Sequence, residues 1–158
     1  MDNHNRLAAF VDLSADLTAF DEVSLYGTGV AEAYLAATDS VVGAKLTDAL
    51  LGAYIKITLV SHGDAATRAA SLRAEILGDE KLGPIARAIL KLWYIGTWYA
   101  LPERWQEIYG PTPTNNSFVV SQAGYAEGLL WPTIGAHPAG AKAPGFASWV
   151  NPPVFPPI

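Results

Sequence analysis

The stretch IARAILKLWYIGTWYAL, Ile85–Leu101, decides the fold. Its side chains are apolar almost all round, with Arg87 and Lys91 as the charged exceptions. A helix that is apolar on nearly every side is usually buried, so we expect this stretch to form the central and most buried helix. Pro84 would lie near its first turn, where a missing N–H is tolerated, and Pro102 is expected to end it.

Neighbouring stretches carry apolar residues at helical spacing, which predicts amphipathic helices packed around this central one. The apolar stripes run through Leu7–Leu17, Val30–Leu35, Leu46–Val60 and Ala69–Leu77, and a further turn or two of helix is expected at Glu103–Tyr109.

Polar residues between the stripes are expected to cap these helices. The side chains of Asp21, Thr28 and Asp64 can each accept a hydrogen bond from an amide in a first helical turn. A last short helix is expected over Ser117–Leu130, although Phe118–Val120 carries a weak strand pattern.

The C-terminal residues have an unusual composition. The stretch Ile108–Ile158 contains two charged side chains, Glu127 and Lys142, and seven prolines from Pro132 onward. So many prolines oppose regular structure, while the apolar composition is the reverse of a disordered segment. We therefore predict an all-α fold, with a compact bundle of about five to six helices in residues 1–131 and a long irregular arm in residues 132–158.

Composition narrows the possible functions. Charged residues make up 16 % of the 158-residue chain, compared with about 25 % in typical domains, so part of the surface is expected to be covered by a partner. The net charge of −5, without a basic block, argues against a nucleic-acid partner.

The absence of cysteine excludes disulfides and thiolate chemistry. No run of about 18 apolar residues predicts a membrane span.

The sequence shows little catalytic chemistry. His4, His62 and His137 are far apart, in no spacing that suggests a metal site. Gly27-Thr28-Gly29 lacks the third glycine of a dinucleotide-binding loop. The chain therefore resembles a binding scaffold more than an enzyme, and we expect it to hold no cofactor.

The arm and its base supply the candidate functional residues. A Trp-, Tyr- and Phe-rich surface with few charges is typical of the buried centre of a protein interface. Glu127, in apolar surroundings, is expected to pair with Lys142 or with an arginine of the partner. The candidate interface residues are Tyr125, Glu127, Trp131, His137, Phe146, Trp149 and Phe155.

Three stretches in order resemble a known family. They are FVDLSADLTAF (Phe10–Phe20), ILKLWYIG (Ile89–Gly96), and YAEGLLW (Tyr125–Trp131) followed by PGF (Pro144–Phe146) and WVNPP (Trp149–Pro153). Together they resemble the small (gamma) subunit of bacterial FAD-dependent sugar and sugar-acid dehydrogenases, which include the sorbitol, fructose, gluconate and glucose enzymes.

The resemblance implies a non-catalytic subunit. It would bind, stabilise and help to fold and export a large subunit of the glucose-methanol-choline type, which carries the FAD and the catalytic residues. A cytochrome c subunit often completes such complexes. The spacing of Phe146 and Trp149 departs from the family pattern and suggests a divergent member with a different large subunit and substrate.

The family implies a periplasmic location, commonly reached through a twin-arginine signal on the small subunit. The polar residues Met1–Arg6 contain no such pair. If Met1 is the native start, we expect a cytoplasmic location instead.

Two other interpretations stay open. In one, the chain is a self-associating helical protein whose arm swaps onto a second copy. In the other, it is a small ligand-binding or enzymatic domain whose pocket uses Trp93, Trp98, Tyr125 and Glu127.

Overall fold

The computed structural model describes residues 2–110 and 114–142, which are mostly helical and confirm the all-α prediction. The longer helical elements match the four apolar stripes and the central stretch of the sequence. They are α1 (Asn3–Thr18), α3 (Ala31–Val42), α4 (Ala44–Ser61), α5 (Ala65–Ser71) with its π-helical continuation η1 (Leu72–Leu77), and α6 (Leu82–Ile95).

Shorter elements connect and extend this bundle. They are α2 (Glu22–Gly27), β1 (Thr97–Trp98), α7 (Glu103–Tyr109), β2 (Phe118–Val119), α8 (Ala123–Ala126) and α9 (Leu130–Thr133). Helix α7 confirms the element expected after Pro102.

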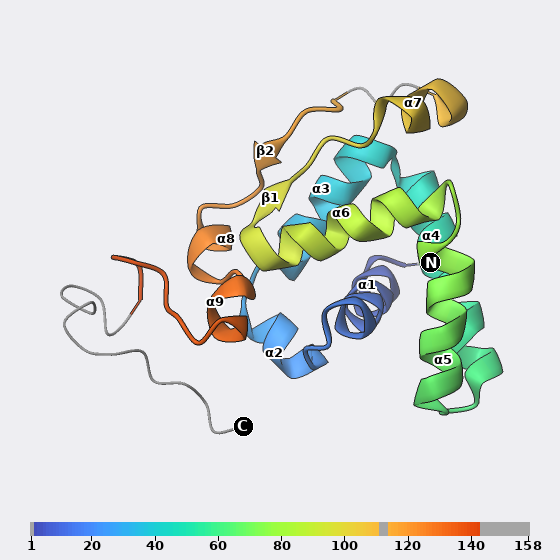
Figure 1. Ribbon diagram of the computed structural model, residues 1–158, viewed down its shortest axis with the longest axis horizontal. Helices are drawn as coiled ribbons and strands as arrows, with labels where there is room; N and C mark the ends of the chain where they lie inside the picture. The colour runs from blue at the N-terminus through green and yellow to red at the C-terminus, as the bar shows by residue number, and fades with distance from the viewer. Residues whose placement is uncertain (1, 111–113, 143–158) are drawn as a thin grey trace.

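Helices α1 and α6 form the centre of the molecule (Figure 1). Helix α6 contacts α1, α3, η1, β1 and α8, while α1 also contacts α2, α3 and α4. The core contains the fully buried side chains of Phe10 and Leu13 from α1, of Ile89 and Trp93 from α6, and of Tyr34 from α3. The central position expected for the Ile85–Leu101 stretch is therefore confirmed for its helical part.

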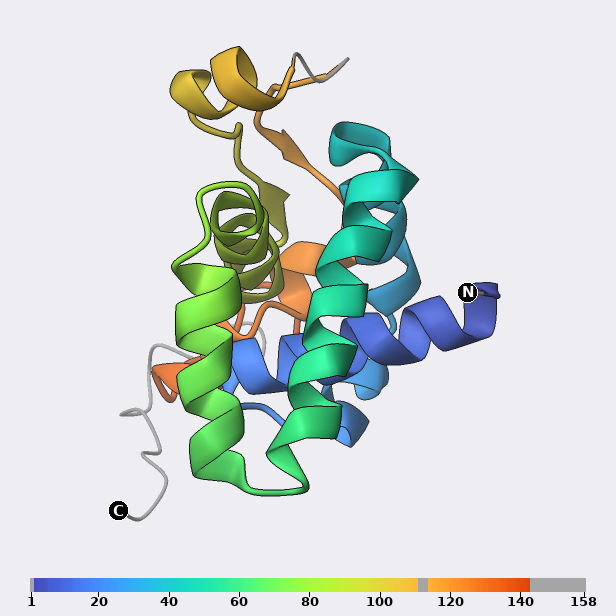
Figure 2. The same ribbon diagram turned by 90° about the vertical axis from the view of Figure 1, so that its right-hand side faces the viewer.

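Helix α4 and the continuous α5–η1 helix lie side by side in opposite directions (Figure 2). His62 ends α4 in the left-handed conformation, and Asp64 accepts a hydrogen bond from the amide of Thr67 to begin α5. The predicted cap at Asp64 is thus confirmed, as is that at Asp21, whose carboxylate accepts a hydrogen bond from the amide of Ser24.

The prediction that Thr28 caps the next helix was wrong. Helix α3 begins after Val30, whose side chain makes no capping bond. The Thr28 hydroxyl donates to the carbonyl oxygen of Leu25 at 2.6 Å, and it accepts a hydrogen bond at 3.4 Å from the amide of Val30, which precedes α3. It therefore satisfies a carbonyl of α2, the preceding helix, because a threonine hydroxyl can serve either side of a turn.

The prediction that the central helix extends to Leu101 was also wrong. Helix α6 ends at Ile95 because Gly96 adopts a left-handed conformation with φ +67°, which glycine reaches without steric cost. The next residues pair with β2 in an antiparallel ladder, with Thr97 opposite Val119 and Trp98 opposite Phe118.

The single helix expected over Ser117–Leu130 was wrong as well. The residues with the weak strand pattern form β2. Only Ala123–Ala126, in α8, and Leu130, in α9, are helical within this range. The first two residues of the predicted arm, Pro132 and Thr133, are helical because they complete the short helix α9, so the irregular arm begins later than expected. Residues 134–142 contain turns without helix or strand, which agrees with the irregular arm expected there. Residues 143–158, the rest of the predicted arm, lie outside the described residues.

Candidate functional site

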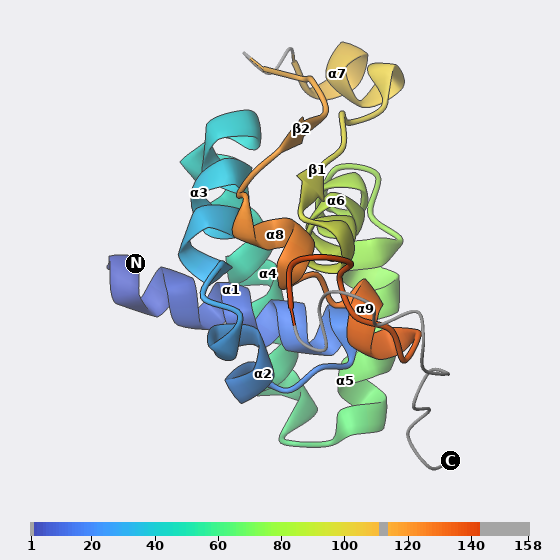
Figure 3. The same cartoon turned by 90° about the vertical axis from the view of Figure 1, so that its left-hand side faces the viewer.

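The base of the predicted arm is fixed to the end of α6 by glycine contacts. A Cβ atom on Gly96 would lie 2.6 Å from the carbonyl carbon of Gly124, and one on Gly128 would lie 2.7 Å from the carbonyl oxygen of Tyr94. Neither distance leaves room for a side chain. The three glycines therefore allow α8 to rest directly on the backbone of α6 (Figure 3).

Backbone hydrogen bonds strengthen this contact. The amide of Leu129 donates to the carbonyl oxygen of Trp93 at 3.1 Å, and the amide of Val120 donates to that of Gly96 at the same distance. Carbonyl groups in the last turn of a helix lack partners within the helix. Here the amides of Val120 and Leu129 supply those partners, so the C-terminal residues and the end of α6 stabilise each other.

Tyr125 and Trp131 form one aromatic unit beyond this anchor. Their rings meet edge to face, with centroids 5.2 Å apart, and the indole N–H of Trp131 donates to the carbonyl oxygen of Tyr125 at 2.6 Å. Tyr125 is 48 % exposed. The pair is therefore held by internal contacts while one of its rings faces solvent.

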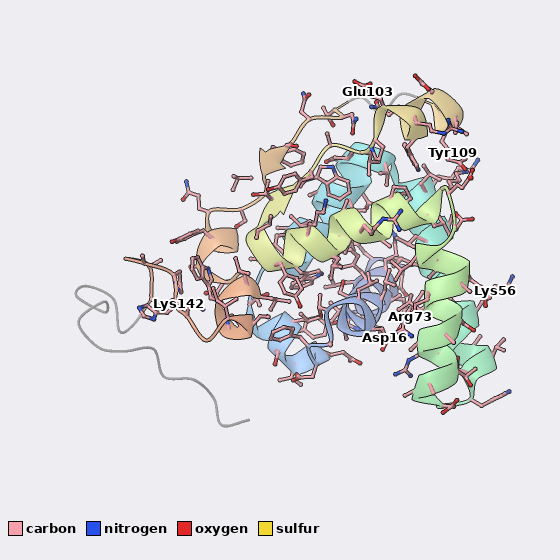
Figure 4. The ribbon with its side chains drawn as sticks, viewed as in Figure 1. Asp16, Lys56, Arg73, Glu103, Tyr109 and Lys142 are labelled. Atoms are coloured by element: carbon pink, nitrogen blue, oxygen red, sulfur yellow. The ribbon has the colours of Figure 1, made fainter. Side chains whose placement is uncertain are left out.

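Glu127 pairs with Lys142, which is one of the two partners that the sequence left open. The Lys142 Nζ lies 2.6 Å from the Glu127 Oε2, and both side chains are partly exposed. Such surface pairs usually contribute less than about 1 kcal/mol. The contact nevertheless places Lys142, the last described residue, beside the base of the arm. Lys142 lies on the opposite side of the molecule from Lys56 of α4 (Figure 4).

A hollow of about 460 Å³ lies between this C-terminal region and α2. We call it the C-terminal hollow. Its lining residues are Phe20, Ser24, Gly27, Thr28, Ala126, Glu127, Gly128, Leu129, Trp131, Pro132, Ala136, His137, Pro138 and Lys142. The structure thus gathers Glu127, Trp131 and His137 around one space, with Tyr125 packed against Trp131. Phe146, Trp149 and Phe155 lie outside the described residues.

The wall of the hollow from Phe20 to Thr28 was not among the sequence-based candidates. Phe20 packs edge to face on Tyr94, with ring centroids 6.5 Å apart, and the Tyr94 hydroxyl donates to the carbonyl oxygen of Thr18 at 3.2 Å. These contacts join residues more than seventy positions apart, so no local sequence pattern signals that this wall faces the arm.

Trp93 and Trp98, which the ligand-binding interpretation placed in a pocket, belong to the core. They are 1 % and 0 % exposed, and Trp93 packs edge to face on Tyr34 with centroids 5.0 Å apart. Burial, with a smaller contribution from the charge of Glu127, raises the pKa of Tyr34 to about 12. These side chains therefore stabilise the bundle beneath the arm.

A second polar cluster joins α1, α4 and α5. The Tyr54 hydroxyl donates to the Asp16 carboxylate at 2.7 Å, and the Arg68 Nε lies 2.8 Å from the same oxygen. Burial, followed by the charge of Glu22, raises the pKa of nearby Asp12. All of Asp16's close partners lie on neighbouring helices, so this cluster holds the helices together.

Residues 2–110 and 114–142 contain no group of three or more histidine, aspartate or glutamate side chains arranged to hold a metal ion. Within the same ranges, no helix has both the length and the hydrophobicity needed to cross a membrane.

Comparisons of the chain with protein-family models, with curated proteins and with solved structures found no match. The resemblance to the dehydrogenase small subunits therefore stays a prediction based on the three sequence stretches.

Proposed function

We propose that this chain is a non-catalytic small subunit that binds and stabilises a large FAD-dependent dehydrogenase acting on a sugar, polyol or related alcohol, and that assists its folding and export. One observation carries the proposal. The base of the arm is anchored firmly to α6, yet it exposes apolar side chains and leads directly into a segment rich in aromatics and proline.

The exposed apolar side chains favour a binding role. Within the C-terminal residues, Tyr125 is 48 % exposed, Ile134 51 % and Val119 66 %. Exposed apolar surface can mark a protein interface, and tyrosine is enriched in such interfaces. The sixteen residues that follow Lys142 add Phe146, Trp149 and Phe155 without adding a charged side chain.

The parts of the three resembling stretches that lie within the described residues also meet in space. Phe10 of the first packs on Trp93 of the second, with ring centroids 6.4 Å apart. Leu129 of the third donates its amide to the carbonyl of Trp93. A shared core gives a physical reason for the three patterns to occur together, which supports the proposal without identifying the partner.

In this proposal the flavin and the substrate chemistry belong to the large subunit. The small chain covers apolar surface of the large subunit and keeps it away from water during folding. A cytochrome c subunit, as in the family it resembles, would receive the electrons. The family also implies a periplasmic location.

Co-expression with a neighbouring flavoprotein gene tests the proposal. We expect the chain to co-purify in equal ratio with a much larger yellow protein, and to be poorly soluble alone. Removing residues 132–158 should abolish the association. A stable monomer that binds no flavoprotein would refute the proposal, and retained binding after truncation would show that the arm is not the interface.

The same exposed apolar surface also fits self-association, our second candidate. Light scattering of the chain alone separates the two functions, because a self-associating chain forms a defined oligomer without any flavoprotein.

A further inference from the structure

We propose that a groove along α6 binds an acidic segment of a partner protein, with Arg87 and Lys91 receiving one carboxylate of that segment. We call it the α6 groove. It is separate from the base of the arm, which rests on the last turn of α6, and the inference does not rest on the proposed function.

The α6 groove lies between one face of α6 and the segment that joins β1 to α7 (Figure 1). Its lining residues are Pro84, Arg87, Ala88, Lys91, Tyr99, Ala100, Leu101 and Pro102. Its volume is about 150 Å³, whereas pockets that enclose a whole small-molecule ligand usually measure about 300–1,000 Å³. The groove therefore fits a side chain presented by a partner better than a free ligand.

The charges of this surface have one sign. The stretch Leu82–Pro102 contains two charged side chains, Arg87 and Lys91, and both line the groove without an acidic residue beside them in the described lining. In residues 2–110 and 114–142, neither cation forms an ion pair. The whole chain, by contrast, has 15 acidic and 10 basic residues. Complementary charge therefore favours an anionic partner at this surface.

Two contacts orient the cations. The Arg87 Nη1 donates to the carbonyl oxygen of Leu77 at 2.7 Å, and Gly83 leaves room for it, since an added Cβ there would lie 3.2 Å away. Leu77 ends the π-helix η1, a rare form that is frequent at functional sites. The Lys91 Nζ lies over the ring of Tyr99, 5.5 Å from its centroid. Because a guanidinium has five N–H donors, Arg87 keeps donors for a carboxylate.

A protein carboxylate suits this geometry. Arginine binds a carboxylate through two parallel N–H···O bonds, and Ala88 and Leu101 line the same groove with apolar atoms for the stem of the acidic side chain. A flat lipid surface would not enter the groove. The partner is therefore expected to present an aspartate or glutamate among apolar residues.

The hollow next to the groove shows the contrast. It measures about 280 Å³, shares Arg87, and has Arg104, Asp79 and Glu80 in its lining. Because charges of both signs meet there, it offers no comparable preference for an anion.

Zero-length cross-linking tests the contact between a carboxylate and Lys91. The probe is an acetylated, amidated peptide with one glutamate between two leucines, coupled by a carbodiimide to the lysine amines of the full chain and mapped by mass spectrometry. Acetylation of the same lysines by a neutral reagent corrects for their intrinsic reactivity. Lys45 and Lys56, both exposed on α4, are the references. We expect the corrected coupling of Lys91 to exceed theirs about fivefold, near the upper range for a partly exposed charge pair.

Substitutions show whether Arg87 is responsible. Arg87→Gln should lower the coupling of Lys91 to that of the references, and Arg87→Lys should retain part of it. Arg73→Gln is the matched control, because Arg73 is exposed on η1, and it should change nothing. Raised salt should reduce the coupling of Lys91, since ions screen exposed charges. If circular dichroism shows that Arg87→Gln does not fold, the unmodified chain and its salt dependence decide the question.

The proposal is overturned by equal corrected coupling at Lys91 and at the two reference lysines, or by coupling that a folded Arg87→Gln variant leaves unchanged. Phosphatidylglycerol vesicles test the other anionic surface. Binding to them that depends on Arg87, without preferential coupling of the peptide, would assign the surface to a membrane and also overturn the proposal.

The test separates this inference from the proposed function. A chain that couples the peptide at Lys91 but binds no flavoprotein refutes the proposed function alone. A chain that binds the flavoprotein but couples the peptide equally at all three lysines refutes this inference alone.

Discussion

Gly96 at the end of α6 and Gly124 in α8 meet backbone to backbone. A Cβ atom on Gly124 would lie 2.9 Å from the α-carbon of Gly96 and 3.1 Å from the Tyr34 hydroxyl. Gly124 does not require a positive φ, so its role here is one of space and not of backbone conformation.

This contact predicts the effect of Gly124→Ala. The added methyl group must push α8 away from α6, and overpacking of this kind typically costs about 1–3 kcal/mol. Gly52→Ala in the middle of α4 is the matched control, because nothing lies within 4 Å of its added Cβ. That change should stabilise the chain by about 0.5–1 kcal/mol. Urea unfolding measures both, and equal effects of the two substitutions would contradict the close packing.

Arg6 is expected to hold three helices together. Its guanidinium on α1 lies 2.8 Å from the Asp39 carboxylate of α3 and 2.7 Å from that of Asp48 on α4. Arg6→Met keeps most of the apolar stem but leaves the two carboxylates without their cation. We expect a loss of about 1–2 kcal/mol, between the values for surface and buried pairs.

Salt supplies the check on that prediction. The difference between Arg6→Met and the unmodified chain should shrink as the salt concentration rises, because ions screen partly exposed charges. Arg73→Met on η1 is the control, since Arg73 is exposed and its loss should change thermal stability little. A salt-independent loss for Arg6→Met would assign its effect to packing.

Asp12 and Asp64 should respond to pH in opposite directions. Burial, followed by the charge of Glu22, raises the pKa of Asp12, so the folded state binds its proton more tightly than the unfolded state. The stability from this proton is fully present below the unfolded pKa of about 3.8 and is lost as pH rises through the folded value. Asp12→Asn should therefore gain stability relative to the unmodified chain as pH rises from about 3 to 7.

Asp64 provides the opposite case. Hydrogen bonds from Thr67 lower the pKa of its carboxyl, so its contribution is present above the unfolded value and is lost as pH falls through the folded one. Asp64→Asn should lose stability relative to the unmodified chain as pH rises over the same range. Thermal unfolding at several pH values measures both slopes, and slopes of the same sign would contradict the environments described.

The features that the sequence predicted well depend on neighbouring residues or on composition. Asp21 and Asp64 cap helices because a carboxylate reaches amides three positions ahead. The Glu127–Lys142 pair was one of two pairings that the sequence suggested, because these are the two charged residues in a long apolar stretch. In each case, the physical reason can be read from a short stretch or from composition.

The features that the sequence missed depend on distant residues. Gly96 ends α6 in a left-handed turn although the helical pattern continues beyond it. There it lies against Gly124, and its carbonyl accepts a hydrogen bond from the amide of Val120. The side of the hollow formed by Phe20 and Thr28 faces the arm through tertiary packing alone. Hydrophobic periodicity reports which residues are buried, but it does not identify the segment that buries them.

Tyr125 should contribute strongly to binding if the arm forms the proposed interface. Its ring is held against Trp131 but remains 48 % exposed, which makes it a rigid aromatic anchor at little cost in side-chain entropy. Tyrosine is among the residues most often found to dominate binding energy. Tyr125→Ala should weaken association with the large flavoprotein subunit by about tenfold or more, which corresponds to ~1.4 kcal/mol.

Val60, which is 71 % exposed on α4, provides the control. Val60→Ala should leave the affinity for the large subunit unchanged. Titration of the purified subunits gives both affinities, and thermal unfolding of each variant confirms that the fold is retained. Equal affinities for the two variants would place the interface away from Tyr125.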